Sequence, residues 1–336
     1  MYEDHSVAVV VPAYNESGLV GEVLETMPAY VDRVYVVDDC STDGTWEEIL
    51  ECANRRDQIA TVSGGDSEEG SDTVADGGAS KFVPIRHERI RGVGGAIKTG
   101  YGRALEDRMD VTAVMAGDGQ MDPAYLDRLL EPIVSGRATY AKGDRLRGRD
   151  RSGMSNWRLF GNGLLSFLTK VSSGYWRMMD PQNGYTAISL EALEEIDLES
   201  LYDEYGFAND LLVVLNTHGF RVADVSMPAV YGEETSHIQY RSFVPGLSWL
   251  LCKRFCRRLY VRYLVDDFHP LAFMYGMGVL AGAATLAGLG VARGRRGAVD
   301  SSDGLSALTA LTVAAVSVLL AMTFDRQEND DRVIVE

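Results

Sequence analysis

Apolar residues in the N-terminal third of the chain form short unbroken runs, with helical spacing in the segments between them. The runs cover residues 7–14, 33–39, 82–86 and 111–116. Unbroken runs of this length are typical of strands buried on both faces of a parallel sheet. Helical spacing covers residues 17–27, with Ser17 as the predicted N-cap, and residues 94–105, and a further helix opens at Thr42 and Asp43. This alternation predicts an α/β fold built on an open, mostly parallel sheet.

Polar clusters follow three of these predicted strands. They read YNE at residues 14–16, DDCSTDGT at 38–45 and GDGQMDP at 117–123. Ligands of open parallel sheets bind beyond the carboxyl ends of the strands. We therefore expect the three clusters to meet at one edge of the sheet and to form a site there.

Two long apolar stretches near the C-terminus differ from everything before them. Residues 271–292 and 304–324 carry no charge, and each is about as long as the roughly 20 residues that span a bilayer. They predict a transmembrane hairpin over residues 270–325. Lysine and arginine residues before the first span indicate, by the positive-inside rule, that this side is cytoplasmic, although the arginines between the spans weaken that argument. The N-terminal domain, residues 1–240, and the tail, residues 326–336, are then cytoplasmic parts of a multi-pass protein of the cell membrane.

The segment before the hairpin, residues 243–266, is amphipathic at helical spacing. Its apolar face carries Trp249, Cys252, Cys256, Leu259 and Tyr263, and its basic face carries Arg254, Arg258 and Arg262. We interpret it as a helix lying in the membrane interface. The alternative is a core helix with a basic outer face.

Charge and composition narrow the class of partner. The formal net charge of −17 and the pI near 4.7 argue against nucleic acid, whose phosphates require a basic surface. An acidic, lysine-poor surface suits a cytoplasm of high ionic strength and indicates a halophilic archaeon; an ordinary acidic protein is the alternative. Residues 63–80 are small and acidic, which predicts a disordered acidic insertion.

A set of motifs carries a family resemblance. They are VVVPAYNE (9–16), VVDDCSTDGT (36–45), GVGGAIKTGY (92–101), GDGQMDP (117–123), KGDR (142–145), SNWRLFGN (155–162) and DPQNGY (180–185). In this order and spacing the chain resembles family 2 glycosyltransferases of the GT-A fold over about residues 6–240. With the two apolar spans, it is most similar to dolichyl-phosphate mannose and glucose synthases. The resemblance implies inverting transfer of a hexose from a nucleotide sugar to dolichyl or polyprenyl phosphate at the cytoplasmic membrane face, feeding protein or surface glycosylation.

The resemblance also implies which residues bind the nucleotide sugar. Pro12, Tyr14 and Glu16 would frame the nucleotide, and Asp39 would contact the base. The alternative for this region is a β-turn with side-chain caps, which does not account for two adjacent aspartates at the end of a buried strand. UDP-glucose is slightly favoured over GDP-mannose as the donor.

A metal site is implied at the GDGQMDP motif. Relatives carry Asp-x-Asp there, whereas this chain has Ala116 in place of the first aspartate. Asp118 and Gln120 are the implied ligands of Mg²⁺ or Mn²⁺, and Asp118 is also an implied catalytic residue. One carboxylate is enough, because Mg²⁺ usually takes only one or two beside substrate phosphates and water. Asp122 is either a further ligand or a helix cap, and Asp118 itself could be a turn residue without chemistry.

The acceptor determines which other catalytic groups are needed. A sugar hydroxyl requires a general base, whereas an ionised phosphate monoester does not. Arg145 and Arg158 are implied near the acceptor and the diphosphate, where a guanidinium suits phosphate. Asp180 and, more weakly, Asp210 are candidate bases if the acceptor is the sugar hydroxyl of a lipid-linked glycan. A third possibility is a catalytically weak membrane scaffold, which the substitution at Ala116 supports.

Overall fold

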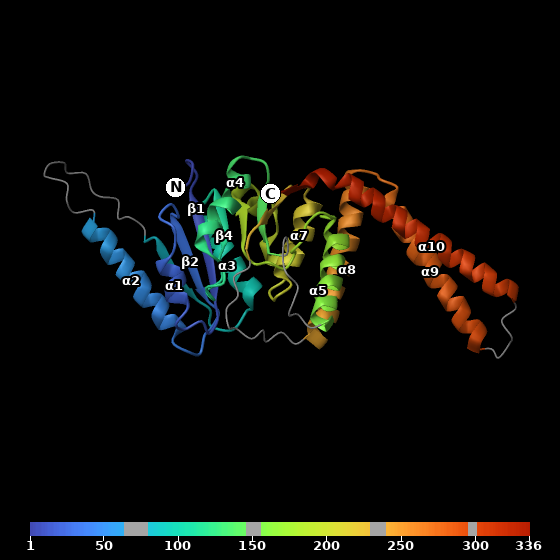
Figure 1. Ribbon diagram of the computed structural model, residues 1–336, viewed down its shortest axis with the longest axis horizontal. Coiled ribbons are helices and arrows are strands. Elements are labelled where there is room, and N and C mark those ends of the chain that lie inside the picture. The colour runs from blue at the N-terminus through green and yellow to red at the C-terminus, as the bar shows by residue number, and fades with distance from the viewer. Residues whose placement is uncertain (64–79, 146–155, 229–239, 295–300) are drawn as a thin grey trace.

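The computed structural model of the chain describes residues 1–63, 80–145, 156–228, 240–294 and 301–336 (Figure 1). The predicted acidic insertion lies almost wholly outside the described residues. One eight-stranded sheet runs through the N-terminal body in the order β3-β2-β1-β4-β6-β5-β7-β8. Two long helices, α9 and α10, project from one end of this body as a hairpin.

The first half of the sheet is parallel, as the apolar runs predict. Its strands are β1 (Val7–Ala13), β2 (Arg33–Asp38), β3 (Phe82–Arg86) and β4 (Val111–Val114). β1 pairs in parallel with both β2 and β4, and β2 pairs with β3. The connecting helices are α1 (Val20–Glu25), α2 (Thr45–Ser63) and α3 (Val93–Glu106). The predicted cap at Ser17 is wrong: Leu19 is the N-cap residue of α1, and the Ser17 amide donates instead to Asp43.

The second half of the sheet contains the one antiparallel strand among the strands that the structure describes. Its strands are β5 (Tyr140–Asp144), β6 (Thr186–Ser189), β7 (Val222–Ser226) and β8 (Val333–Val335). β6 runs antiparallel to β4 and β5, while β7 and β8 continue in parallel. The helices here are η1 (Pro123–Tyr125), α4 (Leu126–Val134), α5 (Asn156–Ser173), α6 (Leu190–Glu195), η2 (Leu198–Ser200) and α7 (Phe207–Thr217). The prediction of a mostly parallel α/β sheet is confirmed.

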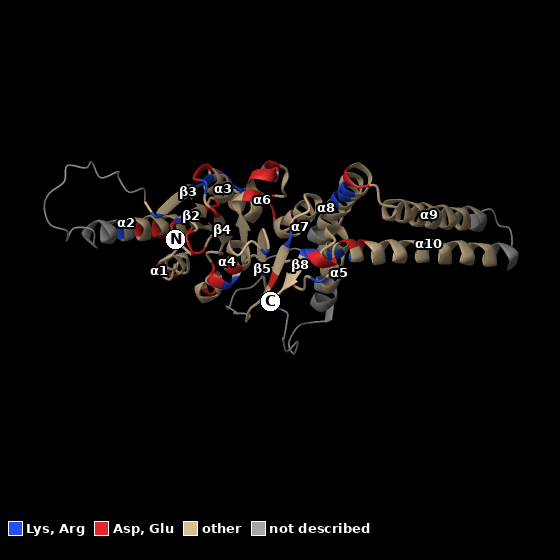
Figure 2. Ribbon diagram, turned by 90° about the horizontal axis from the view of Figure 1, so that it is seen from above, with Lys and Arg blue, Asp and Glu red and all other residues tan. Residues whose placement is uncertain are grey.

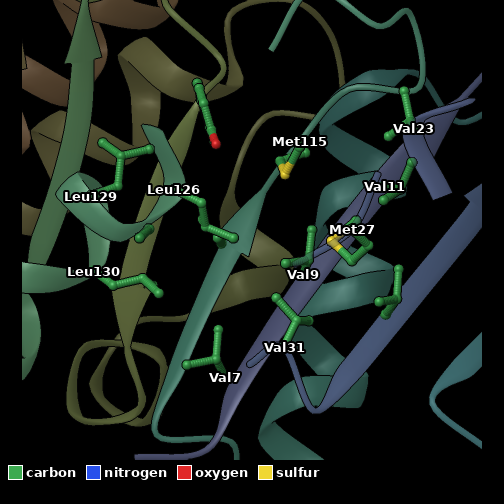
Figure 3. Packing of buried hydrophobic residues seen from close by; sticks show 14 of the residues in the cluster. Val7, Val9, Val11, Val23, Met27, Val31, Met115, Leu126, Leu129 and Leu130 are labelled. Atoms are coloured by element: carbon green, nitrogen blue, oxygen red, sulfur yellow. The ribbon is translucent and has the colours of Figure 1, made fainter. Parts of the chain in front are cut away.

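Side-chain alternation along β1 divides the apolar core into two layers. Val7, Val9 and Val11 pack on the face covered by α1, α2 and α4, together with residues such as Leu126 (Figure 3). Val10 points to the opposite face, which α3, α6 and α7 cover. There α3 comes so close that a Cβ at Gly100 would lie 2.3 Å from Val10 Cγ1. This close packing fixes the height of α3 against the sheet.

The C-terminal part leaves the sheet and then returns to it. α8 (Tyr240–Tyr260) and the π-helical turn η3 (Val261–Asp266) lead into α9 (Leu271–Gly294) and α10 (Ser301–Glu328). Leu271–Val291 and Gly304–Glu328 are long and apolar enough to cross a membrane. Figure 2 shows few charged residues along the hairpin and many where it joins the body. After α10 the chain adds β8 beside β7, so the predicted tail contains a strand of the sheet.

The arginines of α8 that the sequence places on its basic face turn toward the rest of the protein. The Arg254 guanidinium donates to both carboxylate oxygens of Asp210, at 2.6 and 2.8 Å, and the fully buried Arg258 pairs with Asp325 at 2.9 and 3.0 Å. Trp249, by contrast, is 67% exposed. Leu247 and Leu251 are buried on the same inward side, whereas Lys253 and Arg257 are exposed like Trp249. Arg254 and Arg258 therefore face inward and not outward, which differs from the basic outer face of the core-helix alternative.

The Arg258–Asp325 pair gives a test of how the hairpin is attached. We expect Arg258→Met to destabilise the full chain by about 3–5 kcal/mol, because it leaves the Asp325 carboxylate buried without its cation. Denaturant unfolding of the detergent-solubilised protein measures the change. Arg257→Met, at the exposed neighbouring position, is the matched control and should stay within about 0.5 kcal/mol of wild type. Equal effects of the two substitutions would contradict a structural role for the buried pair.

Candidate active site

The loops that follow β1 and β2 are joined into one unit. Asn15 adopts a left-handed backbone with φ of 57°, and its side-chain oxygen accepts a hydrogen bond from the Thr42 amide at 2.9 Å. The Glu16 amide donates to Thr45 Oγ1 at 2.8 Å. The Gly117 amide donates to the Pro12 carbonyl at 3.0 Å and joins the loop after β4 to the same unit. The three polar clusters therefore meet at one edge of the sheet, as predicted.

The residues expected to frame a nucleotide lie along this edge. Pro12 is buried near the end of β1, and the next loop carries Tyr14, which is 44% exposed, and the half-buried Glu16. Asp39 follows β2 directly and is almost fully buried. An exposed aromatic ring next to buried carboxylates is a surface that a nucleoside can contact, through stacking and through its N–H and hydroxyl donors.

Asp39 also holds the loop that follows β3. One carboxylate oxygen accepts from His87 Nδ1 at 2.7 Å and from the Arg91 amide at 2.8 Å, and the other accepts from the Gly92 amide at 2.8 Å. His87 Nε2 lies 2.9 Å from Thr99 Oγ1 on α3. A carboxylate has about four acceptor positions, so Asp39 keeps some capacity for a ligand. The sequence reasoning missed His87, whose only signal is its place directly after β3.

Asp118 lies in a tight turn and is half-buried. Its Oδ1 accepts from the Gln120 amide at 3.0 Å, and Gly119 between them has φ of 71°. Burial raises the pKa of the Asp118 carboxyl above its ordinary value, and the nearby Arg145 guanidinium partly offsets this shift. Asp118 is thus a turn residue in the structure, although one of its carboxylate oxygens is not used by this hydrogen bond.

Asp122 acts as a helix cap. Its Oδ1 accepts from the Ala124 amide at 2.9 Å, and Pro123 is the first residue of η1. This is the arrangement that a side-chain cap followed by proline at the first helical position produces. The capping alternative for Asp122 is confirmed.

Asp118 and Arg145 line a common cavity of about 80 Å³. Gln120, Asn183 and Tyr185 are also in its wall. Arg145 Nε donates to Asp180 Oδ2 at 2.9 Å, and the Asp180 carboxylate is nearly fully buried. The cavity thus places a carboxylate and a guanidinium within one small polar space. Such a pair can serve a cation on one side and a phosphate group on the other.

Other predicted site residues have different positions. Arg158 belongs to α5, but its side chain lies outside the described residues. Asp210 is fully buried in its ion pair with Arg254 and also accepts from the Tyr202 amide. That engagement leaves Asp210 poorly suited to act as a general base, because a base must reach the substrate proton.

A wider groove of about 980 Å³ lies beside β3. Its walls are the loop of residues 86–91, the segment of residues 200–204, and Leu250 of α8. Arg86, at one end of the first wall, forms an ion pair with the buried Asp38 at 3.1 Å and stacks over the Trp46 ring. The groove is therefore on the Asp39 side of the sheet edge and not on the Arg145 side.

The donor set limits which metals the site could hold. Within the described ranges, no three His, Cys, Asp or Glu side chains come together as a metal site. The carboxylate of Asp118 and the side-chain amide of Gln120 can both offer oxygen ligands at one turn. Such ligands suit a hard divalent cation that takes its remaining ligands from phosphate and water. The residues present therefore fit Mg²⁺ or Mn²⁺ as a cation bound together with a diphosphate.

Comparison with known proteins places this edge in a family. The family model described as Glycosyl transferase family 2 matches residues 8–197, more than half of the chain. The chain is a family 2 glycosyltransferase. Its sheet order and helices are those of the GT-A fold. A crystal structure of glucosyl-3-phosphoglycerate synthase from Mycobacterium tuberculosis with UDP is similar, with a TM-score of 0.54 at 17% identity over 75% of this chain and 80% of that one.

Curated relatives of this glycosyltransferase resemble most of its catalytic domain. The UDP-N-acetylglucosamine--dolichyl-phosphate N-acetylglucosaminyltransferase of Methanococcus voltae is 26% identical over 232 residues, which are 68% of this chain and 88% of the relative. The polyprenol monophosphomannose synthase of Mycolicibacterium smegmatis is 29% identical over 234 residues, 65% of this chain and 74% of the relative.

Because the pKa of Asp118 is raised in the folded state, its negative charge destabilises the folded protein at neutral pH. A carboxyl whose pKa is raised in the folded state destabilises that state once pH exceeds the folded pKa. We therefore expect Asp118→Asn to melt at the same temperature as wild type, or higher, at pH 7. The same variant should lose the increase in melting temperature that Mn²⁺ with a nucleoside diphosphate gives the wild type. Thermal melting with and without these ligands measures both effects.

Asp122→Ala is the matched control for this test. Loss of a cap costs about 1 kcal/mol, so this variant should melt lower than wild type and yet keep the increase given by Mn²⁺ and nucleotide. An increase that survives in Asp118→Asn and vanishes in Asp122→Ala would reverse the two assignments.

Proposed function

We propose that this glycosyltransferase transfers a hexose from a nucleotide sugar to dolichyl or polyprenyl phosphate, with inversion at the anomeric carbon. The observation that carries the proposal is the shared cavity of Asp118 and Arg145. The reaction brings together two phosphate-bearing substrates, a diphosphate that leaves and a monophosphate that attacks. A cation site and a fixed guanidinium in one cavity suit that pair of anions.

The spacing of the strands supports the donor side of the proposal. Neighbouring strands lie about 4.8 Å apart, and β1 separates β2 from β4. Asp39 and Asp118 are therefore on the order of 10 Å apart along the edge, a span that suits the base and the diphosphate of one extended nucleotide. In this proposal Tyr14 and Glu16 lie alongside the ribose, and the groove beside β3 is at the nucleoside end.

A divalent cation, Mg²⁺ or Mn²⁺, would be held by Asp118 and Gln120 and would offset charge on the leaving diphosphate. A crystal structure of the M. tuberculosis synthase with Mn²⁺ and UDP-glucose has a similar fold, with a TM-score of 0.52 at 16% identity over 77% of this chain and 81% of that one. This supports a cation of this kind beside a nucleotide sugar.

The state of Asp180 supports a phosphate acceptor. Its carboxylate is nearly fully buried and engaged with Arg145, whereas a general base must reach the proton of the acceptor hydroxyl. A phosphate monoester anion needs none: one of its oxygens forms the new bond to the anomeric carbon, and the bond to the nucleoside diphosphate breaks with its electron pair. The names of the curated relatives support the same acceptor class.

The outer face of α8 supports a location at the membrane surface. Trp249 and Tyr260 are exposed on that face, and Phe268 and Phe273 continue the apolar surface into α9. Aromatic residues of this kind are enriched at membrane interfaces. We propose that α8 and η3 lie in the interface, that α9 and α10 span the bilayer, and that the catalytic domain is cytoplasmic.

The central test measures transfer by the purified full chain in detergent at high salt. Dolichyl phosphate and a lipid-linked glycan serve as alternative acceptors, with Mn²⁺ and radiolabelled UDP-glucose, GDP-mannose or UDP-N-acetylglucosamine. We expect acid-labile label in dolichyl phosphate, UDP-glucose as the donor, and a loss of at least about 100-fold in Asp118→Asn. Label found only in the glycan would contradict the proposed acceptor, and nucleotide binding without transfer to either acceptor would favour a scaffold.

Asp180→Asn separates the two acceptor classes by its kinetics. If Asp180 orients Arg145 toward a phosphate, the substitution raises the acceptor KM more than it lowers kcat. If Asp180 is the base for a sugar hydroxyl, kcat falls by about 100-fold or more. Steady-state kinetics with varied acceptor concentration measure which of the two parameters changes.

The membrane location predicts a spectroscopic result. Brominated lipids in nanodiscs should quench the fluorescence of Trp249, because a tryptophan in the interface lies near the bromine atoms. Trp249→Phe should remove most of the bromine-dependent quenching. Trp46→Phe, which alters a half-buried residue on α2, should leave it unchanged. The same quenching in wild type and Trp249→Phe would contradict the proposed position of α8.

A further inference from the structure

A fully buried lysine contacts the loop that lines the cavity of Asp118 and Arg145. Lys142 is on β5, where its register partners are Thr186 of β6 and Asp224 of β7. Its ammonium donates to the backbone carbonyl of Asn183. Arg145, three residues further along the chain, lines the cavity. Lys142 has no role in the transfer reaction as proposed so far.

Burying this ammonium is costly, so a packing role alone does not explain it. Removing a charge from water costs several kcal/mol unless partners compensate, and an apolar side chain of similar length would fill a strand position at lower cost. Burial lowers the pKa of Lys142 to about 7, although Asp180, Asp224 and Asp144 favour the charged form; Arg145 disfavours it. Lys142 therefore changes charge near neutral pH.

The contact partner of Lys142 belongs to the loop that shapes the cavity. Asn183 donates from its side chain to the Gly143 carbonyl at 2.8 Å, and its side-chain oxygen accepts from the Tyr185 amide at 3.1 Å. The same loop begins with Asp180, which pairs with Arg145. Lys142 and Gly143 thus hold this loop against β5, and Asn183 and Tyr185 of the same loop line the cavity.

We propose that Lys142 is a positioning residue for the transfer reaction: its ammonium holds the loop of residues 180–185 and shares the charge of Asp180, which leaves Arg145 able to bind the phosphate of the acceptor. This inference rests on the proposed function. When Lys142 loses its proton, Arg145 becomes the main cation near Asp180 and is drawn to it more strongly. The affinity for the acceptor phosphate then falls.

The proposal predicts that the affinity for the acceptor phosphate falls as pH rises, which is opposite to the effect expected from ionisation of the phosphate itself. The second ionisation of a phosphate monoester has a pKa near 6, so the acceptor itself becomes more anionic, and binds a cation better, as pH rises. Deprotonation of Lys142 acts in the opposite direction above about pH 7. A loss of affinity between pH 6.5 and 8.5 is therefore assigned to the protein and not to the lipid.

The test is calorimetric binding of farnesyl phosphate, a short polyprenyl phosphate, to the full chain in detergent at pH 6.5 and 8.5. We expect wild type to bind about tenfold more weakly at the higher pH, on the scale of one lost charge-assisted hydrogen bond. Lys142→Met should bind about tenfold more weakly than wild type at pH 6.5 and show no further loss at pH 8.5. Binding of a nucleoside diphosphate with Mn²⁺ should be unchanged in this variant, which also establishes that it is folded.

Lys170→Met is the matched control. Lys170 is a half-buried lysine that is also influenced by Asp224 and Asp144, but it lies on α5 and contacts Met179, outside the 180–185 loop. It should keep the affinity and the pH dependence of wild type. The inference would be overturned, without the proposed function, if Lys142→Met bound farnesyl phosphate like wild type. The same holds if the affinity of wild type did not fall with pH. Wild type that binds nucleotide but no farnesyl phosphate would overturn the proposed function and this inference with it.

Discussion

The parallel pairing of β1 with β2 and β4 is the constraint on which the candidate site depends. Ala13 lies opposite Asp38 on β2, and Val10 lies opposite Val114 on β4. This register delivers the loops after all three strands to the same edge, where hydrogen bonds from Asn15 and Gly117 join them. Because a parallel register sets every residue of a strand at once, a shift in any one strand would separate Asp39 from Asp118. The site is therefore a consequence of the sheet.

An acidic protein that binds anions must concentrate its positive charge locally. The chain has a net charge of −17, yet Arg145 and Lys142 lie beside the cavity, and each is balanced by buried carboxylates. These carboxylates have two effects. They favour the charged form of Lys142 and hold Arg145 in place, and they compete with any phosphate for the same cations. The balance between Asp180, Lys142 and Arg145 is what sets how strongly the cavity attracts a phosphate.

The sequence predicts the parts of this structure that depend on local patterns. The first four strands, the site loops and the two long apolar helices follow from apolar runs, motifs and length. The features it misses depend on distant partners. β6 has only four residues and runs antiparallel, and β8 follows the apolar hairpin. The inward face of α8 depends on Asp210 and Asp325, which are 44 and 67 positions from their arginines, so helical spacing identifies the two faces without indicating which is buried.

The same long-range pairing makes the hairpin part of the fold. Asp325, near the end of α10, accepts hydrogen bonds from Arg258, from the Tyr263 hydroxyl at 2.9 Å and from Trp176 Nε1 at 3.2 Å. Trp176 lies four residues before Asp180, on the segment that continues into the loop lining the cavity. The end of the apolar hairpin and the loop that orients Arg145 thus contact one buried network. Because β8 returns the chain to β7, the hairpin is held at both ends, and a flexible tether is excluded by the buried contacts at its base.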